Sequence, residues 1–169
     1  MSTYVEDLLT RFESKGALVD TNLLLLLLIG FYDRTLIGNF KRVAAYTLED
    51  FLLLAWLLEK KFKTSVTTPH VLTEVSNLAG QIQENRKAGC FKQFVETFCT
   101  FTELTSTSFS ATARPEFPYL GLTDCVIAEW ASHYLVITDD LPFWDALGKA
   151  GLDALNFNHI RTMAWKMSK

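Results

Sequence analysis

Two short apolar runs of this sequence end in carboxylates. Asp20 follows the run at residues 17–19, and Asp139 and Asp140 close the run at residues 134–137. Runs of this kind are typical of buried strands in a parallel sheet, and the functional sites of such sheets form beyond the carboxyl ends of the strands. Acids that lie far apart in the sequence are therefore expected to meet at one edge of the sheet.

Two more acids lie in expected helices near that edge. Asp124 opens a helix that leads into the second run, and Glu74 lies in the helix that follows Ser65–Thr67. Carboxylates that converge repel one another, and dry ones become protonated unless a cation offsets their charge. Oxygen ligands suit Mg²⁺ or Mn²⁺. Such an ion activates water and stabilises charge on a phosphodiester, and it lets an acidic protein accept a polyanion.

Each acid also has an ordinary structural interpretation. Asp20 and Asp124 could be helix N-caps, which is the usual role of a lone Asp at such a position. Asp139 and Asp140 could form a simple turn, and Glu74 taken alone is better explained as a solvated helix residue. The convergence of acids at the ends of two strands, rather than any single acid, indicates a site.

The elements that must position these acids alternate between strands and helices. The expected strands are residues 17–19, 65–67, 101–104, 134–137 and 154–157. The expected helices are residues 23–32, one after Thr47, one after Thr68, and residues 90–99, 123–132 and 142–150. Thr47 and Asp50 have capping-box spacing, while residues 105–118 are expected to form one long loop. The alternation predicts an α/β fold with a mostly parallel sheet covered on both faces.

The composition fits one domain over residues 1–169 and excludes several classes of protein. With 169 residues, 49% of them hydrophobic and 21% charged, the chain is not a disordered polar tail. A net charge of −3 excludes a protein that coats nucleic acid by charge alone. Three cysteines without a CxxC motif argue against a disulfide framework or a zinc site. The apolar run 23–29 is too short to span a bilayer and resembles no signal peptide, so we expect a cytoplasmic protein without a membrane partner.

Four segments, taken in order, resemble the motifs of the PIN-domain family of metal-dependent nucleases. Residues 18–23 resemble the first motif, hydrophobic–Asp–x–Asn, and residues 68–75 resemble the second, a helix with a single Glu. Residues 122–128 resemble the third, in which an Asp starts a helix, and residues 136–140 resemble the fourth, Thr–x–Asp at a strand end. The resemblance covers about residues 15–160.

This resemblance implies a PIN-like, three-layer α/β/α sandwich that holds Mg²⁺ or Mn²⁺. Carried over by position, the residues that would hold the metal and act in catalysis are Asp20, Glu74, Asp124 and Asp140. The supporting residues would be Asn22, Thr138 and Asp139, with Asn22 hydrogen-bonded to Asp20 or its neighbours.

The implied function is that of an endoribonuclease, a hydrolase of RNA phosphodiesters. One form of it is the toxin of a toxin–antitoxin pair, neutralised by a small antitoxin protein. The alternative is a PIN-like module that binds RNA or a protein but cuts slowly or not at all.

Two further features concern partners. Arg34, Lys41 and Arg42 follow the first acidic motif and could contact RNA phosphates, although such charges more often form a solvated face. Residues 51–58 are apolar on every side, whereas a helix in an outer layer has one covered side. We therefore expect the other side to meet a partner, either a second copy in a homodimer or an antitoxin.

Overall fold

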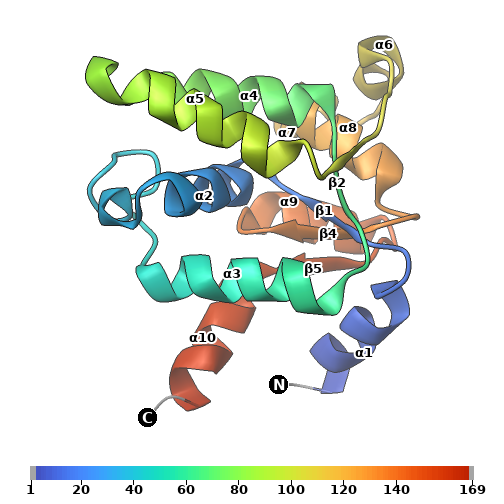
Figure 1. The fold of residues 1–169 in the computed structure, drawn as a ribbon. Coiled ribbons are helices and arrows are strands. Elements are labelled where there is room, and N and C mark those ends of the chain that lie inside the picture. The colour runs from blue at the N-terminus through green and yellow to red at the C-terminus, as the bar shows by residue number, and fades with distance from the viewer. Residues whose placement is uncertain (1–2, 168–169) are drawn as a thin grey trace.

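A parallel sheet forms the centre of the molecule. The structure, a computed structural model, describes residues 3–167 (Figure 1). Its strands are β1 (Ala17–Val19), β2 (Ser65–Thr67), β3 (Thr102–Glu103), β4 (Leu135–Thr138) and β5 (Ala154–Asn156). Every pairing is parallel, and the order across the sheet is β3-β2-β1-β4-β5. Because β1 and β4 are neighbours, with Val19 paired to Ile137, the acids that follow these two strands lie at the same edge.

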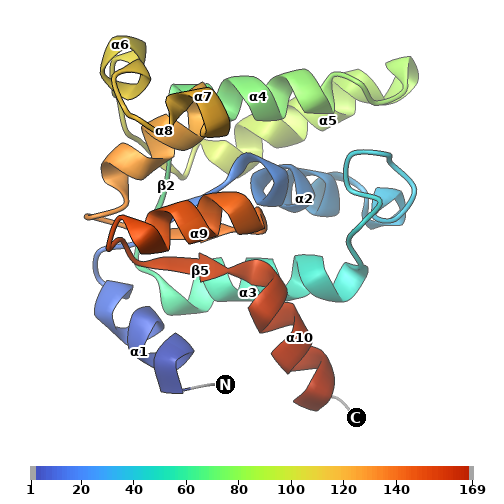
Figure 2. The same ribbon diagram turned by 180° about the vertical axis from the view of Figure 1, so that it is seen from behind.

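Helices cover both faces of this sheet, which confirms the predicted α/β/α sandwich. Those of the described residues are α1 (Thr3–Phe12), α2 (Thr21–Tyr32), α3 (Leu48–Lys61), α4 (Pro69–Ala79), α5 (Glu84–Phe98), α6 (Ser108–Thr112), α7 (Phe117–Leu120), α8 (Leu122–Trp130), α9 (Leu141–Lys149) and α10 (Phe157–Met167), with a 3₁₀ turn at Arg34–Leu36. Helices α4, α5 and α8 lie on one side of the sheet, and α1, α3 and α10 lie on the other (Figures 1 and 2). The sheet is wholly parallel, where the sequence predicted a mostly parallel one.

Helix α2 is apolar on all sides because other helices surround it. It packs against α3, α4 and α5, and its residues from Leu23 to Gly30 are buried. At Gly30 a side chain would collide with the ring of Phe51, since an added Cβ would lie 2.1 Å from that ring. Among residues 3–167 no helix combines the length and the apolar character needed to cross a membrane.

The helix starts predicted from Thr47 and Thr68 are confirmed. The Thr47 backbone N–H donates to Asp50 Oδ2 at 2.9 Å, and the Asp50 N–H donates to Thr47 Oγ1 at 3.3 Å, which completes the capping box of α3. Thr68 caps α4 by accepting the Val71 N–H at 3.3 Å. These caps place the starts of α3 and α4, and α4 is the helix that carries Glu74.

The prediction of one long loop at residues 105–118 is wrong, because this segment contains α6 and the first half of α7. Thr107 caps α6 by accepting the Ser110 N–H at 3.2 Å, and both short helices pack against α8. Helices of one turn are too short to show a hydrophobic period. Helix α5 begins at Glu84 rather than residue 90, and its polar first turns explain the difference.

Candidate active site

Asp20 joins the ends of the two central strands. Its side chain is almost fully buried, with the residue 5% exposed. Oδ1 accepts the Thr21 backbone N–H at 2.6 Å, which makes Asp20 the N-cap of α2. Oδ2 accepts the hydroxyl of Thr138, the last residue of β4, also at 2.6 Å. Asp20 is therefore both a helix cap and a link between β1 and β4.

Glu74 reaches the same region from α4 and connects two other segments. Its Oε2 accepts the Thr21 hydroxyl at 3.0 Å, and its Oε1 accepts the Thr123 hydroxyl at 2.6 Å. Thr21 directly follows Asp20, and Thr123 directly precedes Asp124 in α8. Glu74 is exposed, as expected for a solvated helix residue. Its carboxylate nevertheless connects the segment that contains Asp20 to the segment that contains Asp124.

The surroundings of Asp124 and Asp20 disfavour the charged forms of both carboxylates. The pKa of Asp124 is raised to about 8, mainly by burial, and the negative charges of Asp20, Asp140 and Glu74 add to the rise. The pKa of Asp20 is raised to about 6, again mainly by burial. The hydrogen bonds from Thr138 and Thr21 act against that rise. The four predicted acids thus lie close enough to affect one another's ionisation.

Asp139 and Asp140 are adjacent but differ in environment. Asp140 is exposed and caps α9, because its Oδ1 accepts the Phe143 N–H at 2.8 Å. Its own N–H donates to Thr138 Oγ1 at 3.0 Å. Asp139 is partly buried, and its Oδ2 accepts the Tyr46 hydroxyl. Its Oδ1 is buried and has no hydrogen-bond partner in the described part of the chain.

The threonines of the site were missed by sequence reasoning, apart from Thr138. Thr21 and Thr123 hold Glu74, whereas Asn22 is exposed and has no hydrogen bond to Asp20 among the contacts of residues 3–167. A signal was present, since each of the three aspartate motifs places a threonine within two residues of its acid. Tyr46 had no comparable signal, because it contacts Asp139 from a distant segment.

The predicted RNA-binding cations lie in the segment between α2 and α3. The Arg34 guanidinium lies 5.5 Å from the ring centroid of Phe51, and Arg42 Nε donates to Gln81 Oε1 at 2.8 Å. Lys41 is exposed. None of the ion pairs within residues 3–167 neutralises any of the four predicted acids.

An open pocket of about 310 Å³ lies between α4 and α8 and includes Glu74 and Thr123 in its wall. His70 also lines it, but its Nε2 is hydrogen-bonded to Ser108 Oγ at 2.9 Å. This bond ties α6 to the start of α4. The pocket therefore gives solvent access to the Glu74 side of the acidic edge.

The donor set fits a hard divalent cation by its chemistry. All the converging side chains offer oxygen, and Asp139 Oδ1 is a buried acceptor that lacks a donor. Within the described residues, however, no three His, Cys, Asp or Glu side chains are grouped so that they could hold a metal ion. Mg²⁺ keeps several waters and commonly binds through one or two carboxylates, so it does not require such a group.

Comparison of the chain with protein-family models, with curated proteins and with solved structures found no match.

Proposed function

We propose that this protein is a Mg²⁺- or Mn²⁺-dependent endoribonuclease. The observation that supports the proposal most is the meeting of four acids from four segments at one sheet edge, where the pKa of Asp20 is raised to about 6 and that of Asp124 to about 8. Strongly shifted carboxylates in an accessible region are typical of functional sites. The order of the four motifs, which resembles that of PIN-domain nucleases, supports the choice of RNA as substrate.

The four acids at this edge of the sheet would bind the cation. Asp20, Asp124 and Asp140 would hold the cation, and Glu74 would join them by releasing one of its two threonine hydroxyls. When bound, the cation offsets the repulsion among the acids, neutralises phosphate charge and lowers the pKa of water. Attack by water opposite the P–O3′ bond would leave a 5′-phosphate and a 3′-hydroxyl, with the water proton passing to the leaving oxygen.

Cleavage of an end-labelled single-stranded RNA tests this proposal. We expect cleavage with Mn²⁺ or Mg²⁺, none in excess chelator, and none by Asp20→Asn or Asp124→Asn. Asp145→Asn is the matched control, since Asp145 pairs only with Lys149 on the surface of α9 among the ion pairs of the described residues. Undiminished cleavage in chelator, or equal cleavage by all variants, would reject the metal mechanism.

A specific observation favours the alternative of a binding module that does not cut. Both Glu74 oxygens are already hydrogen-bonded to threonines, and no three-ligand group is present among the described residues. In the same assay, retention of RNA in Mn²⁺ without any product would identify the protein as such a module.

Association through α3 forms part of the proposal. One face of α3 is buried, but Leu48, Leu52 and Trp56 lie four residues apart on the other face and are 40%, 46% and 41% exposed. A second copy would bury this stripe. Light scattering should then give a dimer that Leu52→Glu converts to a monomer. A monomeric parent protein would reject the homodimer and leave the surface to a partner such as a small antitoxin.

A further inference from the structure

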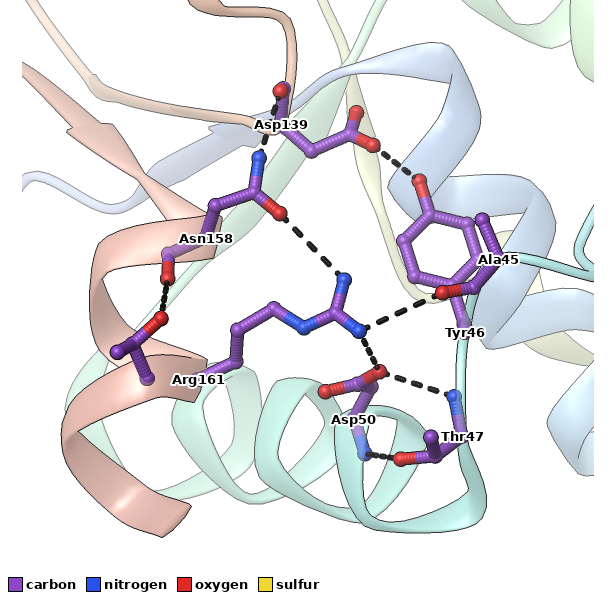
Figure 3. Close-up of polar contacts among 8 residues, drawn as sticks. Ala45, Tyr46, Thr47, Asp50, Asp139, Asn158 and Arg161 are labelled. Carbon is purple, nitrogen blue, oxygen red and sulfur yellow. Dashed lines mark hydrogen bonds and ion pairs between the residues drawn. The ribbon is translucent and has the colours of Figure 1, made fainter. Parts of the chain in front are cut away.

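Asp139 is held by polar contacts from two segments that lie outside the four acidic motifs (Figure 3). The Tyr46 hydroxyl donates to its Oδ2, and Asn158 Nδ2 donates to its backbone oxygen at 2.9 Å. Asn158 is fixed in turn, because its backbone N–H donates to Asn156 Oδ1 at 3.0 Å. Both the main chain and the carboxylate of Asp139 are therefore restrained.

Tyr46 is itself clamped by Arg161 of α10. The tyrosine is 6% exposed, and the Arg161 guanidinium lies 5.8 Å from the centroid of its ring. Arg161 Nη2 also reaches the backbone oxygen of Ala45 at 3.4 Å. The ring and the residue before it are thus held by one side chain (Figure 3).

Arg161 is anchored by a buried ion pair. Its Nη2 lies 2.8 Å from Asp50 Oδ2, and the two side chains are 15% and 0% exposed. Asp50 is fixed by the capping box with Thr47, while Arg161 Nη1 also contacts Asn158 Oδ1 at 3.4 Å. Segments 45–50 and 158–161 therefore form one rigid unit that meets Asp139.

These contacts fix the position of Asp139 Oδ1, which accepts no hydrogen bond from the described residues. A hydroxyl on Oδ2 fixes the rotation of the carboxylate, and Oδ1 remains buried without a partner in the described residues. Buried acceptors nearly always have a donor, so an unpartnered one calls for an explanation. The negative charge of Asp139 also acts on Asp20, which places Asp139 within electrostatic reach of the predicted metal ligands.

We propose that Tyr46 is a positioning residue, which orients Asp139 so that Oδ1 can accept from a water of the bound cation or contact the cation itself. This inference rests on the proposed function. Side chains that orient the ligands of a metal commonly change its affinity by about 10–100-fold when they are removed. Tyr46 and the Asp50–Arg161 pair would supply that orientation from segments far from the acidic motifs.

Calorimetric titration of Mn²⁺ into the full chain tests the inference without reference to activity. Tyr46→Phe removes only the hydroxyl, and we expect it to weaken Mn²⁺ binding by about tenfold. Tyr32→Phe is the matched control, because its hydroxyl donates to the Arg86 backbone oxygen at 3.1 Å in a different part of the fold. It should bind like the parent. Asp139→Asn should lose at least as much Mn²⁺ affinity as Tyr46→Phe. The double variant should bind Mn²⁺ no more weakly than Asp139→Asn alone.

The possible outcomes separate the two proposals. If the parent and Tyr46→Phe bind Mn²⁺ equally, the role of Tyr46 is rejected while the metal site stands. An equal loss in Tyr46→Phe and Tyr32→Phe would assign the effect to general stability and also reject the role. If the parent binds no Mn²⁺, the proposed function fails and this inference fails with it.

Discussion

Asp20 and Asp50 are both buried aspartates that accept a backbone N–H at the start of a helix, but they differ in what surrounds their charge. Asp50 accepts the Thr47 N–H and pairs with the Arg161 guanidinium at 2.8 Å. Asp20 accepts one backbone N–H and one hydroxyl, and its neighbours include the negative charges of Asp139 and Asp140. Within residues 3–167, Asp50 has a counter-ion, whereas the donors to Asp20 are neutral.

This difference separates a structural acid from a candidate site. Removing one partner of a buried ion pair such as Asp50–Arg161 strongly destabilises the fold, because the other charge stays buried without its counter-ion in the pair. An acid such as Asp20 destabilises the fold as long as it stays charged, and a cation from solvent would relieve that strain. The two aspartates should therefore respond in opposite ways to the same substitution.

The largest expected effect is the loss of metal-dependent cleavage in Asp20→Asn. Removing this proposed ligand should lower cleavage by at least about 100-fold, more than the loss of an outer contact. The melting temperature without metal should stay equal to that of the parent or rise, because repulsion at the acidic edge is reduced. RNA cleavage and thermal denaturation measure the two effects. A melting temperature well below that of the parent would show that Asp20 is chiefly a structural cap.

Asp50→Asn should have the opposite pattern. We expect it to lower the free energy of unfolding by roughly 3–5 kcal/mol, since the buried Arg161 guanidinium would lose the carboxylate that lies 2.8 Å from it. Urea denaturation at neutral pH measures this loss. In the double variant Asp50→Asn/Arg161→Met, part of the stability should return, because the buried guanidinium is removed together with its carboxylate partner. A single variant as stable as the parent would mean that the pair contributes little.

Stability without metal should fall as pH rises from 5 to 8. Asp20 and Asp124 have folded-state pKa values of about 6 and about 8, above the ordinary value of 3.8. Over that window the folded chain binds more protons than the unfolded chain, so raising the pH favours unfolding. The loss should be about 5 kcal/mol by urea denaturation in chelator.

Two controls assign this pH dependence to the acidic edge. Asp20→Asn/Asp124→Asn should lose most of it, and added Mg²⁺ should raise the stability of the parent at pH 8. If the parent were equally stable at both pH values, the strain at the edge would be absent.

The smallest expected effect is that of Thr138→Val. Its hydroxyl lowers the pKa of Asp20, so its removal should raise that pKa further and weaken Mn²⁺ binding by a few-fold. Titration followed by carboxyl NMR signals and calorimetry measure the two changes. Thr10→Val is the control, because the Thr10 hydroxyl donates to the Glu6 backbone oxygen at 2.9 Å on the surface of α1. Equal behaviour of both variants would exclude a role for Thr138.

Much of the fold could be predicted because it depends on local patterns. The apolar runs predicted the strands β1 and β4, and the Thr47–Asp50 spacing predicted the start of α3. Helix α1 was not predicted, although Val5, Leu8, Leu9 and Phe12 are buried along one face of it. Helices α6 and α7 could not be predicted in the same way, because a single turn carries no period.

The sequence by itself determined which acids follow the strands, since parallel strands bring their carboxyl ends to one edge. Only the tertiary structure decided which buried aspartate has a counter-ion. Asp50 meets Arg161 because α10 packs beside the start of α3, and Tyr46 reaches Asp139 through the same packing. Ion pairs and hydrogen bonds between distant segments depend on distances of a few ångströms, and the folded chain sets those distances.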